Sequence, residues 1–405
     1  MNPLHAINVA IVGTGFMSWV HAEALRRAGV TVRGVLGSTS AKSAAAAEKL
    51  NVPVAYASFD EVLADRAVHA VHVNTPNRLH VPMTRAAVAA GKHVMCEKPL
   101  AMTPDGSAEL VALARANPRL ATGVCYNVRY YPHCAESREM VRRGDLGRLF
   151  HVTGSVAQDW LLYDTDYNWR VLSAEGGELR ALSDIGSHWL DLIHYVTGLQ
   201  IEAVCADFTT VHPTRKRPKG EVETFTNKVQ GERDVEPVAI TTDDYGAVLL
   251  RFRGGARGTF WVSQCSPGRK YCIRYEVAGQ RQALYWDSER CEDLWVGRRD
   301  GPNVAFKRDP SLMSARARSI SDYPGGHDEG YPDTFKQLFR DFYRYIAAGD
   351  FTAARPYPTF EDGHRDIILV EAIRRSGVQR RWVDVSEVGA APGGISRDAR
   401  ARAEA

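Results

Sequence analysis

The sequence lacks the cysteine spacing that disulfide-stapled and zinc-binding proteins need. Its seven cysteines are scattered and none forms a C-x-x-C pair, so we expect neither a disulfide framework nor a metal site. It also lacks any apolar run close to the roughly 18 residues that cross a bilayer. The N-terminal stretch MNPLHAINVAIVG has no basic region, long apolar core and small-residue cleavage site in series. These absences predict a cytoplasmic protein without a membrane partner.

A strong excess of charge of one sign is missing as well. The 405 residues carry a net charge of +3, which gives no reason to expect a nucleic-acid partner. The one concentrated basic run, TRKRPKG at 214–220, contains proline and glycine. Because charge blocks usually lie in water, this run predicts a solvated loop. The length exceeds that of most single domains and suits two.

The first part of the chain alternates β-rich runs with helical patterns. The β-rich runs lie at 7–13, 30–38, 68–76, 93–100 and 121–129. Each is followed by a segment whose apolar residues recur at helical spacing. Strand followed by helix, repeated, predicts a parallel sheet with right-handed crossovers over residues 1–128.

The rhythm changes in the second part, which we assign to residues 129–388. Its β-rich runs follow one another with turn residues and few helices between them, which predicts one largely antiparallel sheet. These runs lie at 148–160, 201–212, 245–254, 257–265, 272–279 and 281–287. Helical patterns are expected at 187–198, 331–349 and 360–377. The tail at 389–405 has the composition of a disordered segment.

A glycine pair follows the first predicted strand. Gly13 and Gly15 lie where a dinucleotide-binding fold needs a tight turn and a close approach of the pyrophosphate to a helix N-terminus. Ser18 replaces the third glycine of that fingerprint. The segment after the second strand, LGSTSAKS at 36–43, has no acid for a ribose. It offers Ser38, Thr39, Ser40 and Lys42 to a 2′-phosphate. The alternative is that Ser38 hydrogen-bonds a ribose hydroxyl of NAD, so the preference for NADP over NAD is slight.

The segment HVMCEKPL at 93–100 combines a thiol, a carboxylate, an amine and a proline. Cys96 ends an apolar strand with no neighbouring histidine, so we expect a packed thiol rather than a nucleophile. Neighbouring side chains of an extended segment point to opposite sides. Glu97 is therefore expected to contact the cofactor or the backbone, and Lys98 the substrate.

These motifs, together with NTPNRLH at 74–80 and SDIGSHWLDL at 183–192, resemble the Gfo/Idh/MocA oxidoreductases. The likeness runs from about residue 7 to 375. It implies a Rossmann domain followed by an α/β domain on an open, mostly antiparallel sheet. It also implies that NAD or NADP is used to oxidise a secondary hydroxyl of a sugar or polyol, and that the open sheet forms a homo-oligomer, a dimer or tetramer.

Residue by residue, the resemblance implies a catalytic set of Lys98, Asp184 and His188. It implies a cis peptide before Pro99. With the residues of the glycine turn and the second strand, the expected cofactor contacts are Gly13, Gly15, Phe16, Met17, Ser38, Thr39, Lys42, Asn74, Thr75, Pro76, His80, Glu97, Lys98, Asn127, Trp169 and Arg170. Arg180 stands where the family usually has a small residue, and could narrow the site or reach the substrate.

The chemistry of these residue types agrees with the roles that the resemblance implies. Removing a hydroxyl proton needs a base, and the unperturbed pKa of histidine lies near neutrality. Asp184 and His188 are four apart and share a face if the segment is one helix. Asp184 would orient the imidazole or bind a hydroxyl, and Lys98 would stabilise the developing negative charge or act as the base. An aspartate and a histidine at this spacing are, by themselves, more often a surface pair or a structural histidine with its partner. They could also be two ligands of a metal site, but we expect no metal here. We interpret Asp191 and His194, further along the segment, as structural.

The substrate-binding candidates lie in the second part. Aromatic faces and polar groups suit a sugar, and the segments YNVRYYP, AQDW and YPGGHDEGY supply both. The expected substrate contacts are Lys98, Arg129, Tyr131, Trp160, Asp184, His188 and His327. Trp160 and His327 resemble a branch of the family with levoglucosan dehydrogenase. The predicted substrate is a sugar, sugar derivative, anhydrosugar or cyclitol.

Two other functions stay open at this stage. An NAD-dependent glycosidase or lyase would oxidise its substrate only transiently and return the cofactor. A non-catalytic sensor would keep the fold and the nucleotide without turnover. The joint presence of Lys98, Asp184 and His188 favours an enzyme over a sensor.

Overall fold

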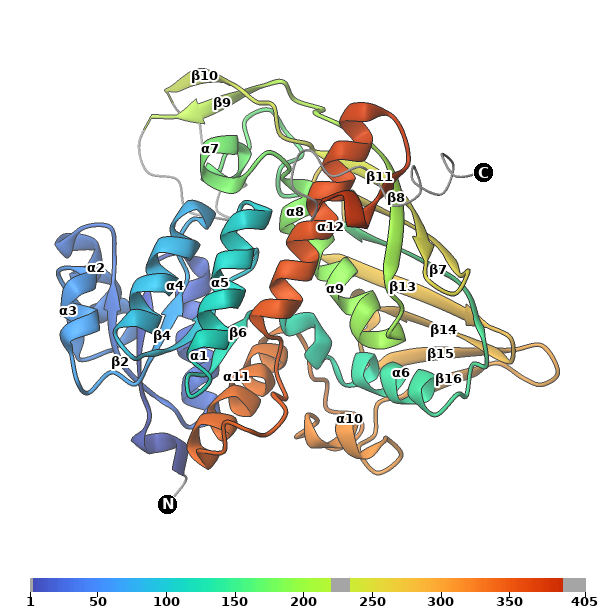
Figure 1. Ribbon diagram of the computed structural model, residues 1–405, viewed down its shortest axis with the longest axis horizontal. Coiled ribbons are helices and arrows are strands. Elements are labelled where there is room, and N and C mark those ends of the chain that lie inside the picture. The colour runs from blue at the N-terminus through green and yellow to red at the C-terminus, as the bar shows by residue number, and fades with distance from the viewer. Residues whose placement is uncertain (1–2, 220–233, 389–405) are drawn as a thin grey trace, which may run out of the picture.

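The computed structural model describes residues 3–219 and 234–388. The predicted disordered tail and the end of the basic run lie outside these ranges. A six-stranded sheet forms the N-terminal half, with strand order β3-β2-β1-β4-β5-β6 and every neighbouring pair parallel (Figure 1). Its strands are β1 (Asn8–Val12), β2 (Thr31–Leu36), β3 (Val54–Tyr56), β4 (Ala70–Val73), β5 (His93–Cys96) and β6 (Thr122–Val124). This order is that of a Rossmann fold, so the predicted fold class of this half is confirmed.

Helices connect these strands and cover both faces of the sheet. They are α1 (Phe16–Ala28), α2 (Ser40–Leu50), α3 (Phe59–Ala64), α4 (His80–Ala89) and α5 (Pro104–Ala116). Strands β1, β4 and β5 are almost wholly buried, which explains why their sequences are continuous apolar runs rather than alternating ones. The short strand β3 was not predicted, because three residues give no period to detect.

The second half is built on a nine-stranded sheet with the order β16-β15-β14-β13-β7-β12-β11-β8-β17. Only β7 and β12 pair in parallel, so the predicted, mostly antiparallel sheet is confirmed. Its strands are β7 (Leu149–Ala157), β8 (Ile201–Thr209), β11 (Tyr245–Phe252), β12 (Arg257–Ser263), β13 (Cys272–Gly279), β14 (Gln282–Asp287), β15 (Asp293–Arg298), β16 (Val304–Lys307) and β17 (Val383–Asp384).

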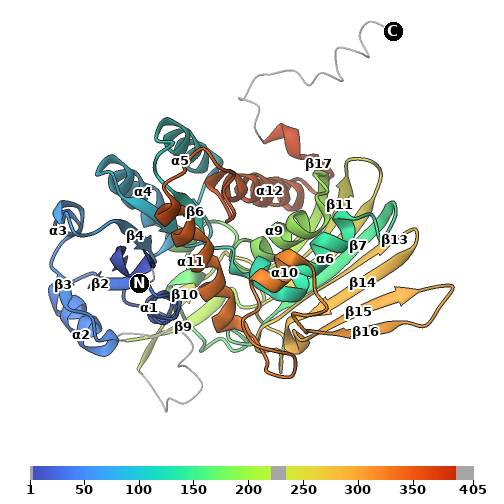
Figure 2. The ribbon, with the colours of Figure 1, turned by 90° about the horizontal axis from the view of Figure 1, so that it is seen from below.

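One face of this sheet packs on helices and the other does not (Figure 2). The helices of this half are α6 (Pro132–Arg142), α7 (Ser173–Gly176), α8 (Ala181–Asp184), α9 (Gly186–Thr197), α10 (Ala315–Ser319), α11 (Tyr331–Ala348) and α12 (Phe360–Gln379). Helix α9 lies directly on the sheet, where Trp189 stacks on Phe260 with ring centroids 4.5 Å apart. Gly154 of β7 permits this contact, because a Cβ there would clash with the Trp189 indole.

Short 3₁₀ helices complete the described residues. They are η1 (Pro3–Ala6), η2 (Asn77–Leu79), η3 (Asn127–Tyr130), η4 (Trp169–Val171), η6 (Ser288–Arg290) and η7 (Val385–Glu387). No helix in the described ranges has both the length and the apolar composition to cross a bilayer.

The two halves are joined by the last two long helices, which lie between the sheets in Figure 1. Helix α11 packs on α1 and places Phe335, Phe339 and Phe342 in the core beneath the parallel sheet. Helix α12 contacts α5 on one side and α9 and β8 on the other. The nucleotide half therefore completes its core with residues from the far end of the chain.

The basic run 214–220 is not the solvated loop that we expected, over the part that the structure describes. It contains strand β9 (Thr214–Pro218), which pairs with β10 (Val235–Ala239). In β9, Arg215 is buried and its Nη2 donates to Asp244 Oδ1 at 2.7 Å, whereas its neighbours Lys216 and Arg217 are exposed. The carboxylate that binds this one buried cation lies almost thirty residues away in the sequence, so charge density alone does not predict its burial.

Arg180 contacts the same carboxylate, so it neither narrows the site nor reaches for the substrate. Its Nη2 donates to Asp244 Oδ1, and it is 2% exposed. Burial and the nearby Arg215 lower the pKa of Arg180 to about 10. Asp244 also accepts backbone hydrogen bonds from Val211 and His212 at its second oxygen.

Replacing Asp244 with alanine should strip two buried guanidinium groups of their shared counter-charge. We expect the free energy of unfolding to fall by about 3–5 kcal/mol, as for other broken buried ion pairs. Urea unfolding followed by tryptophan fluorescence measures this change. The matched control is Glu236→Ala, which breaks the exposed pair with Arg217 and should leave the midpoint nearly unchanged. Equal midpoints for the two variants would contradict this account.

Candidate active site

A cavity of about 880 Å³ lies between the carboxyl edge of the parallel sheet and the start of α9. This is where a doubly wound sheet binds its ligands. The predicted residues that line it are Gly13, Gly15, Phe16, Met17, Ser38, Lys42, Asn74, Thr75, Pro76, Glu97, Lys98, Asn127, Tyr131, Trp160, Trp169, Arg170, Asp184 and His188. Thr39, His80, Arg129 and His327 are not among its lining residues.

The glycine turn forms one end of the cavity. Gly13 has φ +121°, and a Cβ there would clash with the carbonyl of Asn74 in β4's following loop. Gly15 precedes α1 as its N-cap, and a Cβ there would meet nothing, so the helix N-terminus is open to the cavity. Both amide polar atoms of Asn74 and the Thr75 hydroxyl are buried with no hydrogen-bond partner among the residues that the structure describes. Unpartnered buried polar atoms beside an open helix N-terminus fit a nucleotide.

The loop after β2 borders the same end. Thr39 does not line the cavity, because its hydroxyl caps α2 by accepting from the Lys42 backbone N–H at 3.2 Å. Ser38 and Lys42 do line it. This loop therefore presents one hydroxyl and one amine, and no carboxylate.

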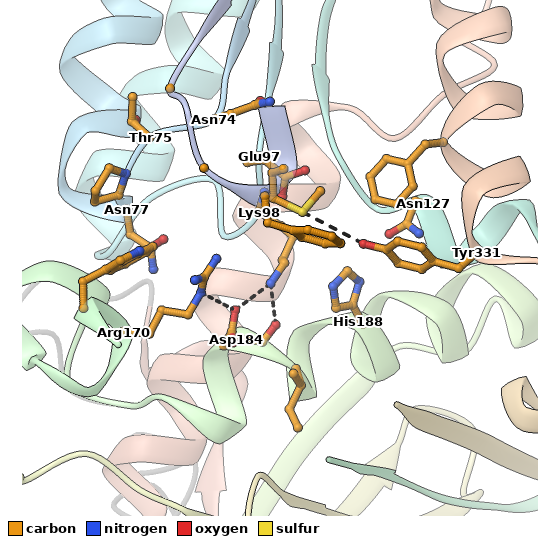
Figure 3. A pocket seen from close by; sticks show the side chains of 18 of the residues that line it. Asn74, Thr75, Asn77, Glu97, Lys98, Asn127, Arg170, Asp184, His188 and Tyr331 are labelled. Atoms are coloured by element: carbon orange, nitrogen blue, oxygen red, sulfur yellow. Dashed lines mark hydrogen bonds and ion pairs between the residues drawn. The ribbon is translucent and has the colours of Figure 1, made fainter. Parts of the chain in front are cut away.

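The opposite end of the cavity is organised by Lys98. The Lys98–Pro99 peptide is cis, as predicted. Lys98 Nζ donates to Asp184 Oδ1 at 2.7 Å and to the Asp184 carbonyl at 2.8 Å, and Figure 3 shows both bonds. An ion pair thus joins the parallel-sheet half to the end of α8.

Asp184 is held as a carboxylate by several donors. Burial would raise its pKa, but Lys98 and Arg170 together hold the pKa well below the usual range. Arg170 Nε lies 3.7 Å from Asp184 Oδ1, and Gln264 Nε2 donates to Oδ2 at 3.2 Å. Asp184 is therefore a fixed negative charge beside the Lys98 amine.

His188 lies beside this pair but is not hydrogen-bonded to Asp184 (Figure 3). Asp184 and His188 would share a helix face only if one helix ran through both, and this condition is not met: α8 ends at Asp184 and α9 begins at Gly186. His188 Nδ1 is buried and has no hydrogen-bond partner within residues 3–219 and 234–388. Burial, followed by the charge of Lys98, lowers the pKa of His188 to about 3, which leaves the imidazole neutral at neutral pH.

His80 supports the cavity wall from behind. Its Nδ1 lies 2.7 Å from the carbonyl of Pro99 and its Nε2 lies 3.0 Å from that of Thr75. The side chain is fully buried. His80 therefore holds the loop of Thr75 against that of Pro99. Contrary to our expectation of a cofactor contact, its side chain does not reach into the cavity.

Arg129 and His327 also lie elsewhere, contrary to the prediction of substrate contacts. Arg129 is bound to Asp191 of α9, with Nε donating to Oδ2 at 2.7 Å, and to Asp362 of α12. Asp191 thus has the structural role that we expected. His327 is exposed, and its carbonyl accepts from Arg308.

Several lining residues were missed by the sequence analysis. They are mainly polar or aromatic side chains from the loop before β13, the segment after β14 and the start of α11: Lys270, Tyr271, Ser288, Glu289, Cys291 and Tyr331. Tyr331 is the last residue of the Gly-rich segment YPGGHDEGY. It lies four residues after His327, which was the predicted substrate contact in that segment. The sequence identified this segment as a candidate for substrate binding, but the fold determines which of its residues faces the cavity.

Comparison with known proteins agrees with this geometry. Residues 7–124 match the family model described as "Oxidoreductase family, NAD-binding Rossmann fold", and residues 134–285 match the "GFO/IDH/MocA C-terminal domain". An uncharacterized oxidoreductase of Synechocystis is 30% identical over 94% of this chain and 97% of its own. The chain belongs to the GFO/IDH/MocA family of oxidoreductases.

Similarity to levoglucosan dehydrogenase, in sequence and in structure, covers nearly the full chain. Levoglucosan dehydrogenase of Pseudarthrobacter phenanthrenivorans is 28% identical over 95% of this chain and 99% of its own. The solved structure of a levoglucosan dehydrogenase in complex with NADH and levoglucosan superimposes with a TM-score of 0.82, at 25% identity over 93% of this chain and 98% of that one. In this GFO/IDH/MocA protein, the glycine turn, Asn74 and Thr75 fit a dinucleotide.

The neutral state of His188 can be tested directly. Because its pKa is lowered to about 3, the imidazole should stay neutral as the pH falls from 8 to 5 and protonate only below that. A ¹⁵N NMR titration of histidine-labelled protein measures the midpoint, and His188→Asn identifies the signal. A midpoint between pH 6 and 7 would contradict the buried, cation-flanked environment described above.

Proposed function

We propose that this protein oxidises a secondary hydroxyl of a sugar, sugar derivative, anhydrosugar or cyclitol by hydride transfer to a nicotinamide cofactor. The observation that carries the proposal is the assembly of Lys98, Asp184 and His188 at one end of a cavity whose other end is an open glycine turn. A fixed carboxylate, an amine and a neutral imidazole are the groups that such an oxidation needs.

We infer that the cofactor is NAD rather than NADP. When bound, the nicotinamide ring supplies the hydride acceptor. The residues that would hold the cofactor are Gly13, Gly15, Asn74, Thr75 and Ser38, with Glu97 and Arg170 towards the reacting end. The family description names NAD, and levoglucosan dehydrogenase was solved with NADH. The slight preference for NADP has no support in these relatives.

Lys98 and His188 have different roles at the substrate oxygen. The ammonium of Lys98 donates to that oxygen and stabilises its negative charge as the proton leaves. The neutral His188 has a free ring nitrogen and accepts that proton. Asp184 holds the Lys98 amine in place through the 2.7 Å bond, and Arg170 and Gln264 hold Asp184.

The far wall suits a hydroxyl-rich ring. Trp160 and Tyr131 supply aromatic faces, and the Trp160 indole donates to Gln158 Oε1 at 3.1 Å. Lys270, Tyr271 and Glu289 add polar groups from the segments that flank β13 and β14 of the large sheet. Apolar faces flanked by polar groups bind the CH and OH surfaces of a carbohydrate.

The test is NADH or NADPH formation with a panel of sugars, anhydrosugars, inositols and glycosides. We expect turnover of at least one sugar or cyclitol, with kcat/KM at least about tenfold higher for NAD than for NADP. A tenfold preference for NADP would overturn the cofactor assignment. Sugar release from a glycoside without net NADH would favour the transient-oxidation enzyme, and binding of NAD without any turnover would favour a sensor.

Variants separate the roles in the same assay. Lys98→Ala and His188→Ala should each lower kcat by about 10²–10⁴-fold. The matched control is His194→Ala on the same helix, whose side chain faces the Leu199 carbonyl instead of the cavity. Unchanged turnover in both active-site variants would refute the catalytic assignment.

We also propose that the uncovered face of the nine-stranded sheet binds a second copy of the chain. Two large apolar side chains of β11 lie exposed on it, Leu249 at 52% and Tyr245 at 39%. An apolar face of this kind marks an interface. Light scattering should give a dimer or tetramer, and Leu249→Arg should reduce the mass. A wild-type mass equal to one chain would contradict the proposal.

A further inference from the structure

A continuous line of buried polar side chains runs behind the Glu97–Lys98 segment. Tyr343 Oη of α11 lies 2.6 Å from His72 Nε2 of β4, and His72 Nδ1 lies 2.8 Å from His21 Nδ1 of α1. His21 Nε2 lies 3.0 Å from Glu97 Oε1. Only Glu97, at the end, lines the cavity. We call Tyr343, His72 and His21 the histidine chain.

The surroundings of the histidine chain are apolar. Its three side chains have no exposed surface, and Glu97 is 7% exposed. Phe339 contacts both imidazoles, with ring centroids 4.8 and 4.7 Å away. In such surroundings each unmade hydrogen bond carries a full desolvation cost. The protons of the histidine chain are therefore expected to be arranged so that every bond is made.

Counting protons fixes the direction of the bonds. If Glu97 is ionised it can only accept, so His21 Nε2 must carry its proton. A neutral His21 then accepts at Nδ1 from His72 Nδ1–H, which leaves His72 Nε2 free to accept from the Tyr343 hydroxyl. Every donor and acceptor is used once, without a charged imidazole.

The other arrangements leave a proton without an acceptor. With Glu97 protonated and donating, or with His21 charged, His72 Nε2 must donate to Tyr343. The Tyr343 hydroxyl proton then has no partner among the described residues, whose only bond to it comes from His72. The geometry thus favours one direction, towards an ionised Glu97. Burial would raise the pKa of Glu97, but the hydrogen bond from His21 and the charges beside it, including that of Lys98, hold the pKa down to about 2.

We propose that His21 and His72 are positioning residues which, with the Tyr343 hydroxyl, hold the Glu97 carboxylate ionised and in one orientation in the cavity wall. This inference rests on the proposed function, because the charge then acts on the nicotinamide. Glu97 adjoins Lys98 at the reacting end of the cavity, and the backbone N–H of Lys98 donates to Glu97 Oε2 at 3.2 Å. A fixed negative charge there favours the cationic ring of NAD⁺ over the neutral ring of NADH.

A metal ion is the competing use of the same atoms. The ligand atoms of His21, Glu97 and Cys125 lie within 4.8 Å of one another. A metal would need the Cys125 thiolate and would displace the proton that His21 gives to Glu97. Burial raises the pKa of Cys125 well above its usual value, which disfavours the thiolate. Metal analysis of the purified protein should find no stoichiometric zinc or iron, and finding it would overturn the proposal.

The tautomers give a first test that needs no turnover. Long-range ¹⁵N–¹H NMR of histidine-labelled protein should show His72 as the Nδ1–H tautomer and His21 as the Nε2–H tautomer, both neutral at pH 7. Signals are assigned with His72→Gln and His21→Gln. The opposite tautomers, or a charged ring in the histidine chain, would overturn the proposal.

Cofactor affinity gives the second test, by calorimetry with NAD⁺ and NADH without substrate. In Tyr343→Phe the ratio Kd(NADH)/Kd(NAD⁺) should fall by about threefold, and in His72→Leu by about tenfold. His72→Gln should stay within about twofold of wild type, because its amide can accept from Tyr343 and donate to His21. The control Tyr345→Phe, on the same helix but bonded to Ala353, should leave the ratio unchanged.

The outcomes separate this inference from the proposed function. An unchanged ratio in Tyr343→Phe and His72→Leu, with both affinities weakened alike, would mean a structural role only and would overturn the inference. Tyr343→Phe decides alone if His72→Leu does not fold. If wild-type protein binds neither nucleotide, the proposed function fails, whereas the tautomers still decide the proton arrangement.

Discussion

The ion pair between Lys98 and Asp184 is the contact on which the rest of the site depends. Lys98 follows the fifth strand of the parallel sheet, and Asp184 ends a short helix of the other half. Both charges are largely withdrawn from water, so each needs the other. The pair fixes the distance between the nucleotide end of the cavity and its substrate end. It also places the neutral His188, one turn away, beside the amine rather than the carboxylate.

The sequence was sufficient for the elements with strong local signals. The buried runs of β1, β4 and β5 and the glycine turn predict a parallel, nucleotide-binding sheet, because those features follow from local chain geometry. The E-K-P segment and the aspartate and histidine near residue 186 were placed in one cavity only through the family resemblance. Composition and periodicity could not bring together residues from two halves of the chain.

The errors share a physical cause, which is that burial of a charged or polar side chain depends on distant partners. Arg129 was expected at the substrate, but Asp191 and Asp362 bind it in the core. Arg215 was expected in water, but Asp244 binds it under a strand pair. His327 was expected at the substrate because its Gly-rich loop resembles one branch of the family, but Tyr331 at the start of α11 is the residue of that loop which lines the cavity.

The packing of α11 on α1 has a consequence for biosynthesis. On the ribosome, all six strands of the parallel sheet are made well before α11, because β6 ends at Val124 and α11 begins at Tyr331. Until then the apolar surface that Phe335, Phe339 and Phe342 cover has no lid. N-terminal domains commonly fold while synthesis continues. In this chain the core of the N-terminal half is complete only once α11 has been made, because α11 supplies part of that core.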